Sequence, residues 1–352
     1  MITVSLCMIV KDEEEVLARC LESVRGFVDE IIIVDTGSSD NTVNIAKKFT
    51  NKIYDFEWCD DFSKARNFAF EKASGTYLMW LDADDVVPKD SLNKLIDIKQ
   101  SLKADVYMLK YDVAFCGEKP TFSFYRERLI KNCVQAKWCG AVHECIVPFG
   151  KVERLDISIC HKKIKHGNPM RNLKIYQRIE KQRGLSPREQ YYYGRELFDN
   201  KKYKKSLKIL KQFVGSGDGW VENIIDAIYL IGKIYIQLDN FKDAKEWLFK
   251  TFNYDCPRAN VCCLLGDVFL KEKNFEYAIF WFDVATKSKD VSFKGGFVEP
   301  MYYNYYPYLQ LCYCNYCLGN LKLAEEYNLL ASKFCLSEQV MHNIKFFESL
   351  KK

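Results

Sequence analysis

Two clusters of acidic residues follow apolar runs in this chain and could do chemistry. The run Tyr77–Leu81 is followed by Asp82-Ala83-Asp84-Asp85, which places three carboxylates within four residues. The run Glu30–Val34 leads into Asp35 and a glycine turn. Carboxylates this close together repel one another unless water or a cation neutralises them. Because buried strands of an open α/β sheet build the ligand crevice at their carboxyl ends, the two clusters predict a binding site.

The elements that would position these acids alternate between strand and helix. We expect strands at Val4–Val10, Ile31–Val34, Ile53–Phe56, Tyr77–Leu81 and Val106–Ala114. Between them, apolar residues at helical spacing predict helices at Glu13–Val24, Thr42–Lys48 with Asp40 as its cap, Phe62–Lys72 and Lys89–Leu102. This alternation predicts an α/β domain whose mostly parallel sheet is covered on both faces.

From about residue 187 the pattern becomes purely helical and repeats. Gly194, Gly232 and Gly266 anchor three copies, spaced 38 and 34 residues apart. Twelve residues after each anchor stands a small residue, and sixteen after it a bulky one: Ser206, Ala244 and Ala278, then Leu210, Leu248 and Phe282. This is the pattern of stacked helical hairpins. It resembles the tetratricopeptide repeat, with a weaker fourth copy anchored on Cys312.

The two patterns predict two domains. We expect an α/β domain at 1–165, a basic linker or helix at 166–186 and a tetratricopeptide-like helical repeat domain at 187–352. An insertion before the last hairpin leads into a group of tyrosines, for which core packing and a binding surface are equally good explanations: Tyr302, Tyr303, Tyr305, Tyr306 and Tyr308.

Composition and charge exclude several classes. The 48% hydrophobic and 28% charged residues are typical of a soluble globular protein, and no apolar run approaches the ~20 residues of a transmembrane segment. The stretch Met1–Val10 is predicted to be a strand, not a signal peptide. Most of the 15 cysteines lie in apolar helical patterns, which indicates reduced thiols and a cytoplasmic location.

Charge is divided unevenly along the chain. Residues 1–160 hold 21 Lys/Arg and 26 Asp/Glu, whereas the remainder holds 31 and 21. The basic excess indicates either a solvated helix face or a positive rim that attracts an acidic ligand or partner. No nucleic-acid-binding motif accompanies it, so we do not expect nucleic acid as a partner.

Four motifs occur in order within the first 165 residues: Lys11-Asp12-Glu13-Glu14, Asp35-Thr36-Gly37-Ser38, Arg66-Asn67 and Asp82-Ala83-Asp84-Asp85. In this order and spacing they resemble family 2 glycosyltransferases of the GT-A fold. The repeat-bearing half is more loosely similar to bacterial enzymes that glycosylate peptides, including the S-glycosyltransferases of glycocin bacteriocins. Two positions depart from the family pattern. Thr36 stands where many members have a second acid, and Asp12 where Asn is common.

The resemblance implies a hexosyltransferase that depends on a nucleotide sugar and on Mn²⁺ or Mg²⁺. Asp84 would bind the metal, and His161 would complete the metal site. Glu144, next to His143, would take the acceptor's proton as general base. The donor would be bound by a further set, in which Asp35 meets the base, Asp82 the ribose or metal shell, and Arg66 the base or diphosphate: Lys11, Glu13, Asp35, Arg66 and Asp82.

The expected reaction moves a sugar from a nucleotide sugar, of the UDP-sugar type, to a peptide or protein acceptor, with inversion. Two alternatives stay open at this point. One is a transferase acting on a cell-envelope or lipid-linked glycan, and the other is a helical-repeat scaffold with an inactive transferase domain. A homodimer formed through the helical repeats is a further expectation.

Overall fold

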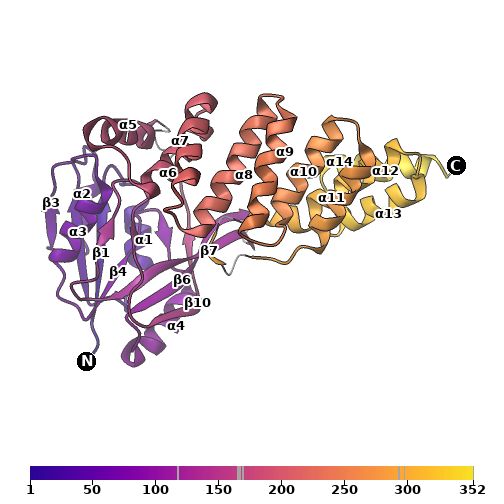
Figure 1. Cartoon of the computed structure of the whole chain (residues 1–352). Coiled ribbons are helices and arrows are strands. Elements are labelled where there is room, and N and C mark those ends of the chain that lie inside the picture. Colours follow the sequence, from indigo (N-terminus) through magenta and orange to yellow (C-terminus); the bar gives the residue numbers. More distant parts are fainter. Residues whose placement is uncertain (117–118, 165–167, 169, 292–293, 297, 352) are drawn as a thin grey trace. The chain divides into compact units, whose positions relative to one another are not determined.

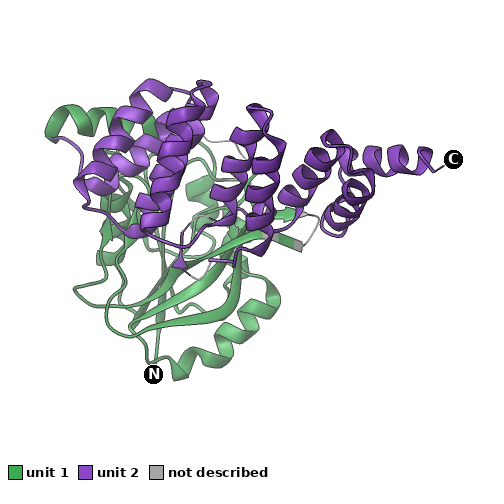
Figure 2. Ribbon diagram, turned by 45° about the vertical axis from the view of Figure 1, so that its right-hand side comes forward, with its two compact units in different colours: residues 1–183 green, residues 184–352 purple. Residues whose placement is uncertain are grey.

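The computed structural model describes residues 1–116, 119–164, 168, 170–291, 294–296 and 298–351. The chain divides into two compact units, Met1–Arg183 and Gly184–Lys352, which have different colours in Figure 2. Part of the predicted linker, at 166–167 and 169, lies outside the described residues. Further along this segment, helix α5 (Arg171–Arg183) belongs to the first unit.

Within the described part of the chain, a mixed eight-stranded sheet forms the centre of the first unit (Figure 1). Its strand order is β3-β2-β1-β4-β7-β6-β10-β5. The strands are β1 (Val4–Val10), β2 (Glu30–Asp35), β3 (Ile53–Asp55), β4 (Tyr77–Trp80), β5 (Asp85–Val86), β6 (Val106–Cys116), β7 (Lys119–Lys131) and β10 (Val152–His161). A separate antiparallel hairpin consists of β8 (Trp138–Cys139) and β9 (Cys145–Ile146).

The parallel part of the sheet is the part that strand–helix alternation predicts. Strands β3, β2, β1 and β4 are parallel, so the carboxyl ends of β1, β2 and β4 meet at one edge. Strand β7 is antiparallel to both β4 and β6. The sequence pattern does not predict β7, because it follows β6 directly and no helix separates the two strands.

Helices connect the parallel strands and cover the sheet: α1 (Leu17–Ser23), α2 (Thr42–Ala46), α3 (Phe62–Glu71) and α4 (Lys89–Ile98). Alternate residues of β1 enter two different core clusters, Leu6 and Met8 the first and Cys7 the second. Apolar side chains therefore pack on both faces, as expected. The predicted cap of α2 needs a correction. Asn41 holds the N-cap position, and Asp40 lies one residue earlier, where it accepts a hydrogen bond from the Thr42 backbone N–H (2.9 Å).

The described regular elements of the second unit are helices, paired in sequence order (Figure 1). The pairs are α6 (Pro187–Asp199) with α7 (Tyr203–Ser216), α8 (Val221–Gln237) with α9 (Phe241–Lys250), α10 (Ala259–Lys271) with α11 (Phe275–Lys287) and α12 (Tyr305–Cys317) with α13 (Leu321–Ser332). Helix α14 (Glu338–Ser349) follows the last pair.

The glycine anchors lie where the two helices of a pair come closest. A Cβ atom on Gly194 would lie 2.3 Å from Leu210 Cδ2, and one on Gly232 would lie 2.6 Å from Leu248 Cδ2. Only a residue without a side chain fits there. The mixed sheet with its connecting helices and the paired helices of the second unit confirm the predicted fold class: an α/β domain of the GT-A type is followed by an all-α, tetratricopeptide-like domain.

The tyrosine group is explained largely by packing. Four of its members are partly buried against one apolar cluster of the repeats: Tyr302, Tyr303, Tyr306 and Tyr308. The hydroxyl of Tyr305 donates to Ser337 Oγ (2.7 Å).

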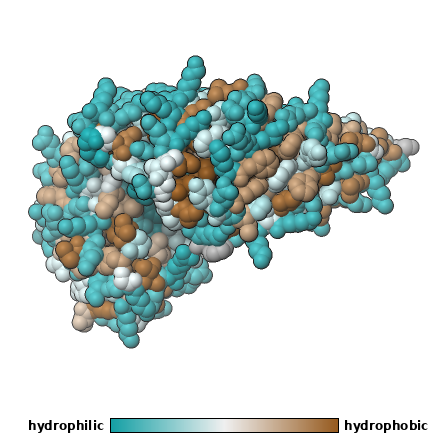
Figure 3. Space-filling model, in the orientation of Figure 1, coloured by the Kyte–Doolittle hydropathy of each residue, from teal (hydrophilic) through white to brown (hydrophobic). Residues whose placement is uncertain are grey.

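Hydrophilic side chains cover much of the face drawn in Figure 3. No helix in the described ranges is long and apolar enough to cross a membrane.

Candidate active site

A cavity of about 450 Å³ lies at the edge of the sheet where β1, β2 and β4 end. Its lining includes Val10 at the end of β1, Thr36 directly after β2 and Trp80 at the end of β4. Eight of the nine predicted site residues also line it: Lys11, Glu13, Arg66, Asp82, Asp84, His143, Glu144 and His161. The structure thus brings together residues that are up to 150 positions apart in the sequence.

Asp35 is the predicted site residue that does not line this cavity. Its side chain is buried and accepts hydrogen bonds from the backbone N–H groups of Gly37 (3.2 Å) and Ser38 (3.0 Å). It also accepts from Ser38 Oγ (2.5 Å). In this structure Asp35 holds the turn after β2, and the neighbouring Thr36 faces the cavity instead.

Arg66 is a nearly buried cation held by two carboxylates. Its Nη2 donates to Asp82 Oδ1 (2.6 Å) and its Nε to Glu144 Oε1 (2.8 Å). The guanidinium carbon lies 5.0 Å from the ring centre of Trp80 and 4.8 Å from that of Trp138. The third nitrogen, Nη1, is buried and has no hydrogen-bond partner among the described residues. Burial lowers the pKa of Arg66, but Asp82 and Glu144 outweigh it, so the pKa lies above its ordinary value and Arg66 stays charged.

Asp82 stays ionised because the positive charge of Arg66 lies next to it. Burial acts to raise the pKa of Asp82. The positive charges of Arg66 and, after it, Arg128 lower this pKa, and together the lowering effects are the larger. The net result is a pKa below the ordinary value of an aspartate. The Arg66–Asp82 pair is therefore fully charged at neutral pH.

Three potential metal ligands converge at the turn after β4. One ligand atom each of Asp84, Asp85 and His161 lies within 4.8 Å of the others. The pairing of β5 with β10 causes this, because it sets His161 directly opposite Asp85. His161 Nδ1 lies 3.4 Å from Asp84 Oδ1 and 3.3 Å from Asp85 Oδ1. Hydrogen bonds to these two carboxylates raise the pKa of His161 to about 9, so the turn attracts positive charge.

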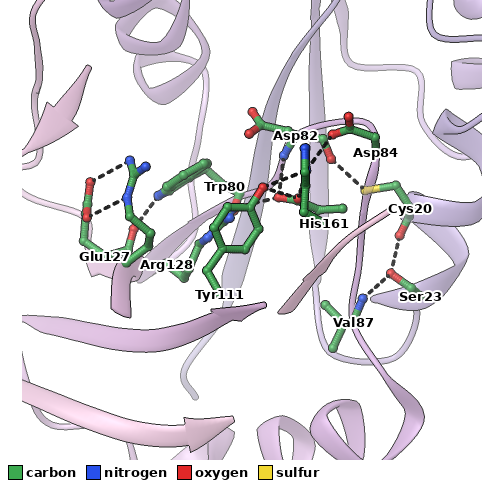
Figure 4. A network of polar contacts seen from close by, with 12 residues as sticks. Cys20, Ser23, Trp80, Asp82, Asp84, Val87, Tyr111, Glu127, Arg128 and His161 are labelled. Atoms are coloured by element: carbon green, nitrogen blue, oxygen red, sulfur yellow. Dashed lines mark hydrogen bonds and ion pairs between the residues drawn. The ribbon is translucent and has the colours of Figure 1, made fainter. Parts of the chain in front are cut away.

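Asp85 differs from Asp84 because other groups already use its oxygens. It is fully buried and accepts hydrogen bonds from Arg128 Nη1 (2.9 Å), Tyr111 OH (2.8 Å) and the backbone N–H of Asp82 (3.0 Å). Arg128 in turn packs over the rings of Trp80 and Tyr111, at 3.7 and 4.3 Å from their centres. Figure 4 shows this network beneath Asp82 and Asp84. Asp84 and His161, both partly exposed, are therefore the residues available to a cation.

Tyr111 connects Asp85 to His161. Its hydroxyl donates to Asp85 Oδ1 and lies 2.8 Å from His161 Nδ1 (Figure 4). Because the single hydroxyl proton goes to the carboxylate, His161 Nδ1–H is the donor in the second contact. His161 must lose its second proton to bind a cation, and in the resulting neutral imidazole the Nε2 lone pair is the ligand atom. Metal-binding histidines usually have such a partner on the other ring nitrogen.

His143 and Glu144 lie in the loop of the β8–β9 hairpin. His143 has a left-handed backbone (φ 52°), and its ring stacks on Tyr176 with centres 6.4 Å apart. Two hydrogen bonds hold the loop: Phe62 N–H donates to the Ala141 carbonyl (2.9 Å) and Tyr176 OH to that of Val142 (3.2 Å). The loop thereby places the Glu144 carboxylate against Arg66.

Some cavity residues were not predicted from the sequence. They include two basic residues and three aromatic ones: Arg126, Arg171, Trp58, Phe62 and Trp80. A usable signal for Arg126 was its place, together with Arg128, in a stretch that continues into apolar Leu129 and Ile130. Charged residues inside an apolar strand are costly unless they are paired, so they point to a functional or structural network.

The family model for glycosyl transferase family 2 matches residues 5–150. These residues carry the predicted motifs and most of the cavity lining. Strands β1 (apart from Val4), β2 and β4 lie within the matched residues and end at the cavity, so the fold and the motifs agree on its position.

Two curated relatives are similar to parts of this chain. A TPR repeat-containing protein of Synechococcus elongatus is 37% identical over 146 residues, which cover 42% of this chain and 36% of that protein. The SPbeta prophage-derived glycosyltransferase SunS of Bacillus subtilis is 26% identical over 264 residues, covering 70% of this chain and 62% of SunS. The chain thus spans about one third to two thirds of the length of these relatives. The solved structure of S. aureus TarS overlaps 69% of this chain and 55% of its own, with 15% identity and a TM-score of 0.42, too low to bear on function.

Proposed function

We propose that this chain is a metal-dependent glycosyltransferase that moves a sugar from a nucleotide sugar to a peptide or protein acceptor. The donor is a UDP-sugar and the transfer inverts the anomeric carbon. The family 2 domain, the cavity at the carboxyl edge of the sheet and the charged residues within it support this proposal. The acceptor class is supported by the helical-repeat unit, since stacked hairpins commonly bind peptides or proteins.

The unpaired Nη1 of Arg66 is the observation that carries the proposal. A buried cationic donor without a partner is costly, and the two carboxylates and two indole rings prevent Arg66 from turning toward solvent. An anionic oxygen of a diphosphate would satisfy this donor with a charge-assisted hydrogen bond. Arg66 would then bind the donor's diphosphate and stabilise the charge that develops as it leaves.

The residues at the turn after β4 fit a divalent cation. Asp84 supplies a carboxylate oxygen and His161 an imidazole nitrogen, a donor set that suits Mn²⁺ better than the all-oxygen preference of Mg²⁺. When bound, the cation would act as a Lewis acid toward the diphosphate. Lys11 and Glu13 would line the nucleotide pocket, and Asp82 would orient the ribose while it fixes Arg66.

Glu144 is the proposed general base, with His143 beside it. Only Oε1 of Glu144 accepts from Arg66, so the contact fixes the carboxylate while Oε2 can take the acceptor's proton. Its role is distinct from that of Asp82, which would orient the ribose, and from that of Asp84, which would hold the cation.

The test is a screen of nucleotide sugars for slow hydrolysis with Mn²⁺ or Mg²⁺, followed by peptide acceptors. Wild-type protein should hydrolyse at least one donor, and EDTA or Asp84→Asn should abolish this, because an amide cannot neutralise the cation. Asp90→Asn, an acid in the first turn of α4, is the matched control. If no donor is hydrolysed, or if turnover persists in EDTA, the proposal of a metal-dependent transferase is wrong.

A further inference from the structure

Two cysteines face each other across the hairpin that carries Glu144. Strands β8 and β9 pair in a register that sets Cys139 directly opposite Cys145. The neighbouring pair, Trp138 and Ile146, is buried at 3% and 1% exposure. Because successive side chains of a strand point to opposite faces, both cysteines lie on the outer face. Consistent with this, Cys139 is exposed and Cys145 is half-buried, and both are thiols in the structure.

Hydrogen bonds define the spacing of the pair. The side chain of Asn67 bonds both the backbone N–H (2.9 Å) and the carbonyl (3.0 Å) of Trp138, so these groups point away from β9. Residues of an antiparallel ladder alternate, which makes Cys139 and Cys145 the hydrogen-bonded pair with Cα atoms about 5.5 Å apart. This matches the most frequent Cα separation in disulfides, about 5.5–6 Å. The Cβ atoms of such a pair lie about 5 Å apart, against about 3.5–4.5 Å in a disulfide, so a bond between the two sulfurs draws these short strands about 1 Å closer together.

We propose that Cys139 and Cys145 form a reversible modification site that exchanges with small disulfides of the glutathione class. The thiolate of one cysteine attacks glutathione disulfide, forms a mixed disulfide and releases one glutathione thiolate. The second cysteine then attacks the protein sulfur of the mixed disulfide and releases the second glutathione. The two cysteines are oxidised to one disulfide, and one glutathione disulfide is reduced to two thiols.

The bond would close the base of the loop that holds His143 and Glu144. This loop includes two left-handed residues, Gly140 (φ 97°) and His143 (φ 52°), so it has a defined shape that opening would disrupt. A crosslink directly at its ends restricts that opening. Formation of the crosslink does not depend on the proposed function. Its effect on the movement of a general base does, because that role of Glu144 rests on the proposed function.

The experiment equilibrates the full chain in buffers of increasing glutathione disulfide, followed by alkylation of thiols and non-reducing peptide mass spectrometry. We expect the Cys139–Cys145 crosslink to be the main product at this hairpin and to disappear with dithiothreitol. Cys59, an exposed cysteine outside the hairpin, reports simple glutathione addition. Cys145→Ser should trap Cys139 as the mixed disulfide. Separate glutathione adducts on Cys139 and Cys145 of the wild type, or no crosslink at any ratio, would overturn the proposal.

Hydrogen exchange measures the effect on the loop without relying on activity. Oxidation should slow the exchange of the amides at 140–144 by about tenfold or more in the wild type, and leave them unchanged in Cys139→Ser. Equal slowing in that variant would contradict the proposed crosslink effect. A protein that forms the crosslink but hydrolyses no nucleotide sugar would remove the proposed function and leave the modification site standing.

Discussion

At the scale of single residues, Tyr111 links the buried carboxylate of Asp85 to the imidazole of His161. Tyr111→Phe removes this link while Asp85 keeps its ion pair with Arg128. The fold should therefore persist, but His161 Nδ1 loses its 2.8 Å contact and keeps only the longer ones to Asp84 and Asp85. We expect the affinity for Mn²⁺ to fall by about 10- to 100-fold, measured by titration calorimetry on folded protein.

A matched variant tests whether this loss is specific. Tyr77 is also buried, and its hydroxyl donates to the Ala104 carbonyl (2.8 Å) in another part of the core. Tyr77→Phe removes a comparable hydrogen bond and should leave Mn²⁺ affinity unchanged. Unaltered affinity in Tyr111→Phe, or the same loss in both variants, would show that Tyr111 does not position His161.

Glu144 offers a second test at this scale. Glu144→Gln keeps an oxygen that can accept from Arg66 Nε but removes the ability to take a proton. The transfer rate should fall by ~10²-fold or more, whereas donor affinity should change little. Rates and donor binding are measured on the same preparation. A parallel loss of donor binding would mean that Glu144 acts mainly by holding Arg66.

At the scale of elements, the repeat glycines fix how closely paired helices approach. Gly232→Ala would place a Cβ atom 2.6 Å from the fully buried Leu248. Overpacking of this kind costs about 1–3 kcal/mol, which exceeds the roughly 1 kcal/mol by which alanine favours a helix. We therefore expect a net loss of up to about 2 kcal/mol in the free energy of unfolding, measured in urea.

Gly215 is the control for this substitution. It lies in α7, is exposed, and a Cβ atom there meets nothing within 4 Å. Gly215→Ala should be neutral or stabilise by up to about 1 kcal/mol. If both substitutions shift stability in the same direction, helix propensity and not the close approach decides the outcome at Gly232.

Helix α10 carries a half-buried acid, Asp267, whose ionisation makes the stability of the fold depend on pH. Burial raises the pKa of Asp267 to about 6 from 3.8, although a hydrogen bond from Tyr306 OH (2.8 Å) acts in the opposite direction. Below about pH 3 the acid is largely protonated in both states. As the pH rises from about 4 to 6 the unfolded chain releases this proton first, so the folded unit loses stability.

Replacement of Asp267 measures the stability that its ionisation costs the folded state. Asp267→Asn keeps an oxygen that can accept from Tyr306 but cannot ionise. The variant should match the wild type near pH 3 and exceed it at pH 7 by up to roughly 3 kcal/mol, measured by urea unfolding at each pH. A difference that does not change with pH would show that Asp267 does not titrate in this range.

At the scale of the whole molecule, the sequence predicts best what depends on local spacing. The repeats follow from Gly232, Ala244 and Leu248 because helix pairing needs a small residue opposite a bulky one. Asp82 and Asp84, which line the cavity, follow from the acidic motif at the end of a strand. What could not be predicted depends on partners distant in sequence. Three acids look equivalent after β4, and only the approach of Arg128 from β7 makes Asp85 structural and leaves Asp84 available.

Asp35 illustrates the same limit in reverse. At the sequence level it has the features of a nucleotide contact, yet Gly37 and Ser38, two and three residues further on, satisfy its oxygens. Aspartate is favoured at the end of a strand both by tight turns and by ligand sites. Only the position of the cavity distinguishes the two, and that position favours Thr36.

The pairing of β5 with β10 also affects the order in which the chain folds. Asp85 and His161 are 76 residues apart, and they meet only when β10 has joined the sheet beside β6. Contacts with such long separations form late, because the chain between them must first be ordered. A chain that ends at residue 150 would contain the whole family 2 match and still lack His161. A cation at this turn would therefore bind only after the sheet is complete, and its binding free energy would stabilise the finished domain and none of its folding intermediates.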